Sequence, residues 1–134
     1  MAITVTAKDA LKTVQLTPGW KRGKCSGHEA TTARDGSGLH KYAIEVDASE
    51  EGFPNPVPLQ DYMISEKATG MAKAFFIACG FPETEWEKLQ KGEKANVQID
   101  EKSPVGKEFQ VMVSNEKYEN RINNKAADFL PKNW

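Results

Sequence analysis

The sequence has few of the residues that build covalent or metal-bound sites. Its 134 residues include two cysteines, Cys25 and Cys79, and two histidines, His28 and His40. Two distant cysteines cannot make a disulfide framework, and in a reduced protein they are typically small buried hydrophobes. Cys25 and His28 are close in sequence, but no second close pair completes a tetrahedral metal site. We therefore expect no metal and no cofactor.

Long hydrophobic runs are also missing. No segment approaches the roughly 18–20 apolar residues that a membrane helix needs. The N-terminus alternates in polarity and carries charge early, unlike a secretory signal. These features predict a cytoplasmic protein with no membrane partner, and 134 residues suit a single domain.

Known catalytic motifs are absent as well. The sequence contains no GxSxG, Walker-type loop, HExxH or paired CxxC. On a regular strand Cys25 and His28 would point to opposite faces, which argues against a nucleophilic pair. Cys79 lies on the apolar side of an expected helix, which favours burial. We therefore predict a binding protein rather than an enzyme.

The net charge is only −1, but it is unevenly distributed. Residues 1–41 hold seven basic and three acidic side chains, whereas residues 42–65 hold five acidic and no basic ones. A polyanionic partner would therefore meet one basic face of the molecule. A solvated, lysine-rich hairpin accounts for the same distribution, and charge alone favours this simpler interpretation.

Alternation and turn residues predict the first half of the fold. Residues 20–32 fit an extended strand whose glycines would permit a bulge. An Asp35–Gly36 hairpin turn follows, and residues 40–48 alternate cleanly. After a proline-rich loop, residues 59–65 predict a third strand.

The second half begins with a change of period. Residues 66–79 have the apolar spacing of a helix, which Gly80 ends. Residues 85–91 predict a second short helix. Residues 95–99 and 109–113 then alternate as the fourth and fifth strands.

This order predicts a mainly β domain with some α-structure at residues 18–123. Three strands, one or two helices and two further strands have the order of a five-stranded OB-like barrel. A plain α+β sheet has the same order, but a coiled first strand with glycines suits a small closing barrel. Residues 1–17 would form an N-terminal arm or an extra strand, and residues 124–134 a C-terminal surface tail.

Cations and aromatic rings gather on the first two strands. Single-stranded nucleic acid is held by Lys and Arg along its phosphates and by rings that stack on its bases. Trp20 and Tyr118 stand among charges, whereas Tyr42 alternates with apolar residues and is a weaker candidate. The candidate nucleic-acid-binding residues are Trp20, Lys21, Arg22, Lys24, Arg34, Lys41, Tyr42, Lys107, Tyr118 and Arg121.

Several short motifs follow one another between residues 15 and 125. They are PGW at 18–20, DGSG at 35–38, YAIEV at 42–46, FFIACGFP at 75–82, LQKGEKANVQI at 89–99 and YENRIN at 118–123. Their order and spacing resemble a family of phage and prophage single-stranded-DNA-binding proteins with an OB fold, long described only as a domain of unknown function. The resemblance implies sequence-independent DNA binding in replication or recombination, without catalysis or metal.

The resemblance would also place the first hairpin and residues 118–121 near the DNA. The residues leave open whether RNA takes the place of DNA. The hydrophobic C-terminus departs from the acidic tail of many single-strand-binding proteins, and self-association along the strand is one use for it. The alternative function is a phage protein-interaction module, such as a virion component or host-protein inhibitor, that uses the acidic residues 45–61 or the FLPKNW end.

Overall fold

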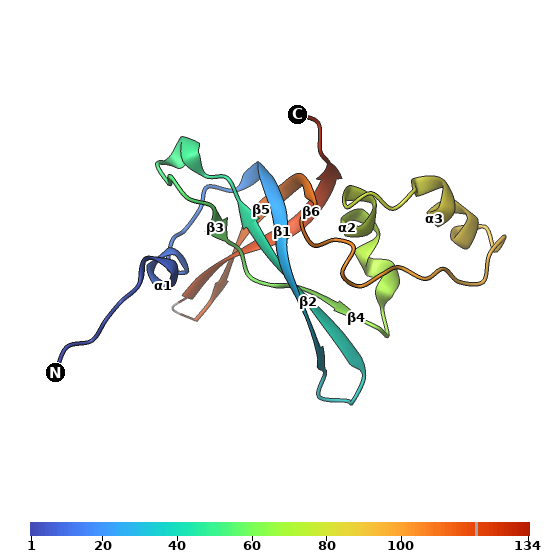
Figure 1. Ribbon diagram of the computed structural model, residues 1–134, viewed down its shortest axis with the longest axis horizontal. Coiled ribbons are helices and arrows are strands. Elements are labelled where there is room, and N and C mark those ends of the chain that lie inside the picture. The colour runs from blue at the N-terminus through green and yellow to red at the C-terminus, as the bar shows by residue number, and fades with distance from the viewer. Residues whose placement is uncertain (120) are drawn as a thin grey trace.

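The computed structural model describes residues 1–119 and 121–134, except for the side chains of Tyr118 and Arg121. Six antiparallel strands form one open sheet in the order β3-β2-β1-β5-β6, with β4 also paired to β2 (Figure 1). The strands are β1 (Gly19–Thr32), β2 (Gly38–Val46), β3 (Val57–Pro58), β4 (Tyr62–Ser65), β5 (Glu108–Tyr118) and β6 (Arg121–Pro131). The prediction of a mainly β protein is confirmed.

The helices are few and short. They are α1 (Ala7–Leu11), α2 (Lys73–Ala78) and α3 (Glu83–Gln90), with 3-10 turns η1 (Ser49–Glu51) and η2 (Thr69–Ala72). The second of the two predicted helices corresponds to α3, while the first is divided between η2 and α2. No helix in the described part of the chain is long and apolar enough to cross a membrane.

Strand β1 joins the two halves of the sheet, because its first residues pair with β5 and its later residues with β2. Gly23 stands where the two pairings overlap, and a Cβ there would lie 2.8 Å from Val111 Cγ1. A bulge between Cys25 and Gly27 then shifts the register with β2. The prediction of a first strand whose glycines permit a bulge is therefore confirmed.

The hydrophobic core lies between the sheet and α2. Phe75 of α2 is fully buried. Its ring lies 5.0 to 6.1 Å, between centroids, from the rings of Tyr42, Tyr62, Phe109 and Phe129. Aromatic contacts of this kind add to the stability gained from apolar burial. One helix and four strands are thereby fixed around a single side chain.

Two segments differ from the sequence-based prediction. Residues 95–99, predicted as a strand, lie in the loop between α3 and β5. Both edges of β5 are already paired, with β1 and β6, so no edge of that strand is free for them. Residues 124–131, predicted as part of a surface tail, belong to β6, and Phe129 contributes to the core. A register shift opposite Met112 and Val113 interrupts the alternation of apolar residues in β6. The sequence pattern therefore does not reveal this strand.

The N-terminal segment is an arm with a short helix, and the alternative of an extra strand is wrong. Its first residues are exposed and lead away from the sheet, whereas Leu16 is buried (Figure 1). Asn124 of β6 holds the arm: its side-chain oxygen accepts from Leu16 N–H at 3.0 Å, and its amide donates to Val14 O. A buried amide with such partners is satisfied, so it fixes the point where the arm joins the sheet.

Candidate nucleic-acid interface

Alternation along β1 sends three of the predicted residues to the outer face of the sheet. Trp20, Arg22 and Lys24 are exposed, while the residues between and after them, Lys21, Gly23 and Cys25, are half-buried or buried. A strand with period two separates its side chains in this way. The outer face is therefore the surface on which these ring and cation side chains can meet a ligand.

Neighbouring strands continue this face in rows. Trp20 lies opposite Met112 of β5, and Arg22 lies opposite Gln110. Leu130 of β6 follows Gln110 in the same row. The row that starts at Arg22 is therefore uncharged on β5 and β6, whereas the row that starts at Trp20 and Met112 ends at the exposed carboxylate of Asp128 on β6.

The C-terminal residue returns over this face. The Arg22 guanidinium carbon lies 5.0 Å from the centroid of the Trp134 ring, and Lys132 Nζ lies 5.4 Å from it. Trp20 and Trp134 line one groove of about 460 Å³. We define the indole face as the set Trp20, Arg22, Gln110, Met112, Leu130, Lys132 and Trp134.

The rings of the indole face are open to solvent. Trp20 is 42% exposed and Trp134 is 37% exposed, while Leu130 is 44% exposed. Two cations beside one indole hold it by cation–π attraction. The arrangement presents ring surface to a planar ligand next to positive charge.

The other cations of the outer face stand opposite carboxylates. Lys24 lies across from Glu45 on β2 and from Glu108 on β5. Lys41 lies across from Glu29. These carboxylates weaken the attraction of both lysines for phosphate. Lys132 also faces a carboxylate, since its Nζ lies 3.5 Å from Glu108 Oε1. The basic face predicted from the sequence is therefore narrower than expected and is centred on Arg22.

Lys21 does not join the indole face, because it points to the other side of β1. Its Nζ forms an ion pair with Glu51 Oε2 at 2.7 Å, and its side chain is largely buried. Lys21 and the Thr17 backbone N–H lower the pKa of Glu51 to about 2. The prediction of Lys21 as a phosphate ligand is therefore corrected, because its ion pair with Glu51 connects β1 to η1.

Tyr42 is a core residue, which corrects its place among the candidates. It is 2% exposed and packs against Phe75. Its hydroxyl donates to the backbone oxygen of Glu101 at 2.6 Å, and burial raises the pKa of Tyr42 to about 12. No base can stack on a ring that is buried in the core.

The remaining candidates lie away from the indole face. Arg34 is in the turn between β1 and β2, and Lys107 lines a different groove, near α2 and α3. The side chains of Tyr118 and Arg121 lie outside the described residues, and their backbones pair at the end of the β5–β6 hairpin. This hairpin end is roughly 20 Å along β5 from Met112, at the usual rise per strand residue.

The cysteines are not activated. Cys25 is fully buried, as predicted, and its thiol donates to Gly27 O at 3.5 Å. Burial raises the pKa of both Cys25 and Cys79, the latter to about 12. Cys25 and His28 would face opposite sides on a regular strand, but β1 is not regular here: the bulge at Ser26 brings both side chains to the inner face.

Sequence reasoning missed Lys132 and Trp134 as partners of the β1 residues. Leu130, Lys132 and Trp134 alternate, which is the signal that could have placed them on one face of a final strand. Comparison with protein-family models and with curated proteins found no match to this chain. The function is therefore argued from the surface itself.

Proposed function

We propose that the protein binds single-stranded DNA on its indole face, without sequence preference. The observation that carries the proposal is the pair of open indole rings, Trp20 and Trp134, in one groove beside Arg22 and Lys132. Exposed rings next to cations are the two elements that hold single strands. Every base has a stacking face, so such a surface does not discriminate sequence.

Stacking would supply most of the affinity. A base stacked on an aromatic ring contributes about 1–3 kcal/mol. Trp20 stands on a paired strand, and the Trp134 ring lies beside the Arg22 and Lys132 cations, so both rings lose little conformational freedom on binding. Two platforms in one groove suit successive bases of one strand.

Phosphates would follow the cations of the same face. Arg22 and Lys132 are the first contacts, and Lys24 adds a weaker one farther along β1. Asp47 and Glu50 line the same groove and Asp128 lies opposite Met112, so their carboxylates repel phosphate and the strand would run from Arg22 over Gln110 of β5 to Leu130 of β6. The number of phosphate contacts is therefore small, and we expect a modest salt dependence.

An OB-like barrel is the finer description that we propose for the fold. β1 pairs with both β2 and β5, and helices α2 and α3 separate β4 from β5. Gln60, between β3 and β4, donates its backbone N–H to Asn124 O on β6 at 2.8 Å. This contact brings the third-strand segment to the last strand, as closure of an OB barrel requires. With the resemblance to phage proteins, it supports a role in phage replication or recombination.

A protein-interaction module is the second candidate, favoured by the carboxylates opposite Lys24 and Lys41. Exposed Trp and Arg side chains are frequent centres of protein interfaces. The indole face carries both kinds within one patch. On this alternative the same surface binds a protein partner and ignores nucleic acid.

The two candidates separate in one titration. A labelled oligo-dT of roughly 30 nucleotides exceeds the site size of an OB fold and has no duplex structure. Its fluorescence anisotropy is followed with added protein at about 50 and 200 mM salt, with unlabelled duplex of equal length as competitor. Saturable binding that weakens with salt and resists the duplex supports the proposal. No binding at the lower salt refutes it and favours a protein partner.

A further inference from the structure

The inner face of the β1–β2 hairpin carries a separate group of polar side chains, which we call the histidine cluster: His28, His40, Glu66 and Glu101. His28 Nε2 lies 2.9 Å from His40 Nδ1. His40 Nδ1 lies 3.6 Å from Glu101 Oε2, and His40 Nε2 lies 3.0 Å from Glu66 Oε1. One ring nitrogen of His28, both ring nitrogens of His40 and one oxygen of each glutamate therefore lie within 3.6 Å of another such atom in the cluster.

Three separate segments build the cluster. Tyr42 pairs with His28 and Ala30 pairs with His40, so the two histidines are diagonal neighbours on adjacent strands. Glu101 comes from the turn that precedes β5, and Glu66 directly follows β4. The chain thus converges on one point from places far apart in sequence.

We propose that the histidine cluster binds a divalent metal ion, with Zn²⁺ as the best fit. One ligand atom from each of His28, His40 and Glu101 lies within 4.8 Å of the others. Two imidazoles and one carboxylate are a frequent zinc set, with bonds of about 2.0–2.2 Å. Two nitrogens on a tetrahedral ion at this bond length lie roughly 3.4 Å apart. The observed 2.9 Å between the imidazole nitrogens needs only a small opening.

Glu66 supplies the support that a metal-bound histidine requires. An ionised carboxylate accepts a hydrogen bond, so the contact at 3.0 Å places the ring proton of His40 on Nε2. The lone pair of Nδ1 then faces His28 and Glu101. Carboxylates behind metal-bound histidines fix the tautomer and strengthen the ligand in this way.

The ligand rings are also fixed in orientation. The His28 ring stacks on the His40 ring with centroids 5.2 Å apart, and it lies 4.9 Å from the Tyr42 ring. The Tyr42 hydroxyl bonds to the backbone oxygen of Glu101, the residue that supplies the third ligand. Little rearrangement would therefore accompany binding, which favours affinity.

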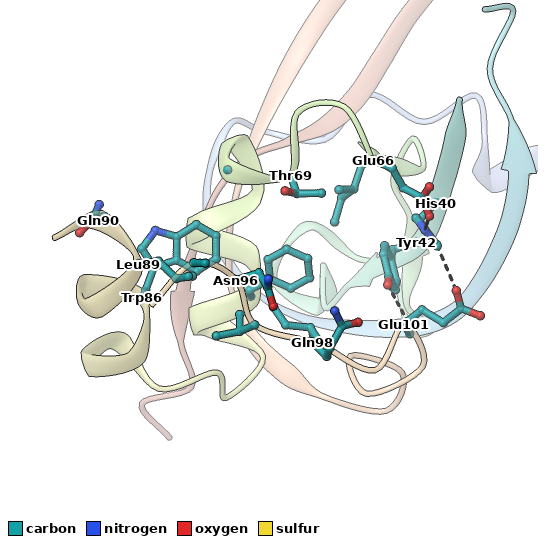
Figure 2. Close-up of a pocket in the computed structure, with 16 residues that line it drawn as sticks. His40, Tyr42, Glu66, Thr69, Trp86, Leu89, Gln90, Asn96, Gln98 and Glu101 are labelled. Atoms are coloured by element: carbon teal, nitrogen blue, oxygen red, sulfur yellow. Dashed lines mark hydrogen bonds and ion pairs between the residues drawn. The ribbon is translucent and has the colours of Figure 1, made fainter. Parts of the chain in front are cut away.

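The site opens onto a groove that His40, Glu66 and Glu101 line. Figure 2 shows His40, Tyr42, Glu66 and Glu101 at one end of a cavity of about 590 Å³, with Trp86 and Leu89 at the other. Three protein ligands leave a fourth position on a tetrahedral ion, which water from this cavity would take. This inference does not rest on DNA binding, because the cluster lies on the inner face, opposite the indole face.

Zinc binding to the untagged chain, first stripped with a chelator, tests the proposal. ZnCl₂ is titrated in competition with a chromogenic chelator, and CoCl₂ is titrated separately to record the visible absorption of tetrahedral Co²⁺. We expect one ion per chain and a tetrahedral Co²⁺ spectrum. Zinc should also raise the melting temperature of the protein, because a ligand of the folded state stabilises it.

Variants locate the ion. His28→Gln and Glu101→Gln should each abolish the Co²⁺ spectrum, while Glu66→Gln should weaken zinc binding by roughly 10- to 100-fold. Glu87→Gln, an exposed glutamate of α3, is the matched control and should bind as the wild type. Melting of each metal-free variant checks the fold, and the exposed Glu101 provides the test if His28→Gln does not fold. Absence of stoichiometric zinc binding, or unchanged binding in Glu101→Gln and His28→Gln, would overturn the proposal.

Discussion

On β1, Lys21 and Arg22 are neighbours in the sequence but face opposite sides of the sheet. Lys21 is held by Glu51, and on the same inner side farther along the strand His28 is held by His40. Arg22 on the outer side instead lies against the ring of Trp134. A basic run on a strand is therefore not one functional unit, because successive side chains point to opposite faces of the sheet. One set of these cations stabilises the fold, and the other is open to a ligand.

The inner side should carry the largest effect on stability. Phe109 pairs with Gly23 and is fully buried, so Phe109→Ala should lower the free energy of unfolding by about 3–5 kcal/mol. Urea denaturation measures the change. DNA affinity of the fraction that remains folded should not change, and a loss below about 1 kcal/mol would contradict the assignment of Phe109 to the core.

The next largest effect on the free energy of unfolding tests the close approach of β1 and β5 at Gly23. In Gly23→Ala the new methyl would lie 2.8 Å from Val111 Cγ1, and we expect a loss of about 1–3 kcal/mol from overpacking. Gly70→Ala is the matched control, because a Cβ there has no heavy atom within 4 Å. Equal melting temperatures for the two variants would show that β1 and β5 are not packed as described.

The outer side should change binding and leave stability almost intact. If Arg22 and Lys132 both contact phosphate, their double replacement by Ala should reduce the salt slope of single-strand binding by about 1.4 log units, at about 0.7 per contact. The matched double variant of Lys24 and Lys41 should reduce it less. Carboxylates stand opposite both lysines, and although Lys132 also pairs with Glu108, it lies with Arg22 beside the exposed Trp134 ring. Anisotropy of oligo-dT across a salt series measures the slopes, and the reverse ranking would move the phosphate path to β2.

The smallest effect concerns the free energy of unfolding at acid pH. Lys21 and Thr17 hold the pKa of Glu51 at about 2, below the usual glutamate value of 4.5, so the folded state favours the charged form. This contribution is present above about pH 4.5 and is lost as the pH falls towards 2. Glu51→Gln should therefore flatten the decline of unfolding free energy in this window, as measured by urea denaturation at stepped pH. An unchanged decline would mean that Lys21 does not stabilise the carboxylate.

Local signals predicted the fold where pairing is short-range. The Asp35–Gly36 turn and the alternation on either side of it correctly predicted the β1–β2 hairpin, and helical spacing placed Phe75 in the core. Residues 95–99 have the alternation of a strand but no partner, because β1 and β6 take both edges of β5. Pairing between distant segments is a property of the whole sheet and is not visible in a local pattern.

The candidate site was only partly predictable for related reasons. Trp20 and Arg22 were identified from charges and rings in the sequence, but the partner role of Trp134 depends on β6, whose alternation is interrupted by a register shift. The proximity of His28 and His40 follows from the hairpin register. The bulge at Ser26, however, decides which side His28 faces, and a bulge cannot be positioned from composition alone.

The central claim is that the indole face stacks on single-stranded DNA, and the affinity of Trp20→Ala tests it most directly. Its control is Trp86→Phe, because Trp86 packs on Phe76 and Phe81 away from that face. The account predicts that Trp20→Ala weakens oligo-dT binding by about 1–3 kcal/mol with an unchanged melting temperature, while Trp86→Phe retains wild-type affinity. Wild-type affinity in a folded Trp20→Ala protein would contradict the account.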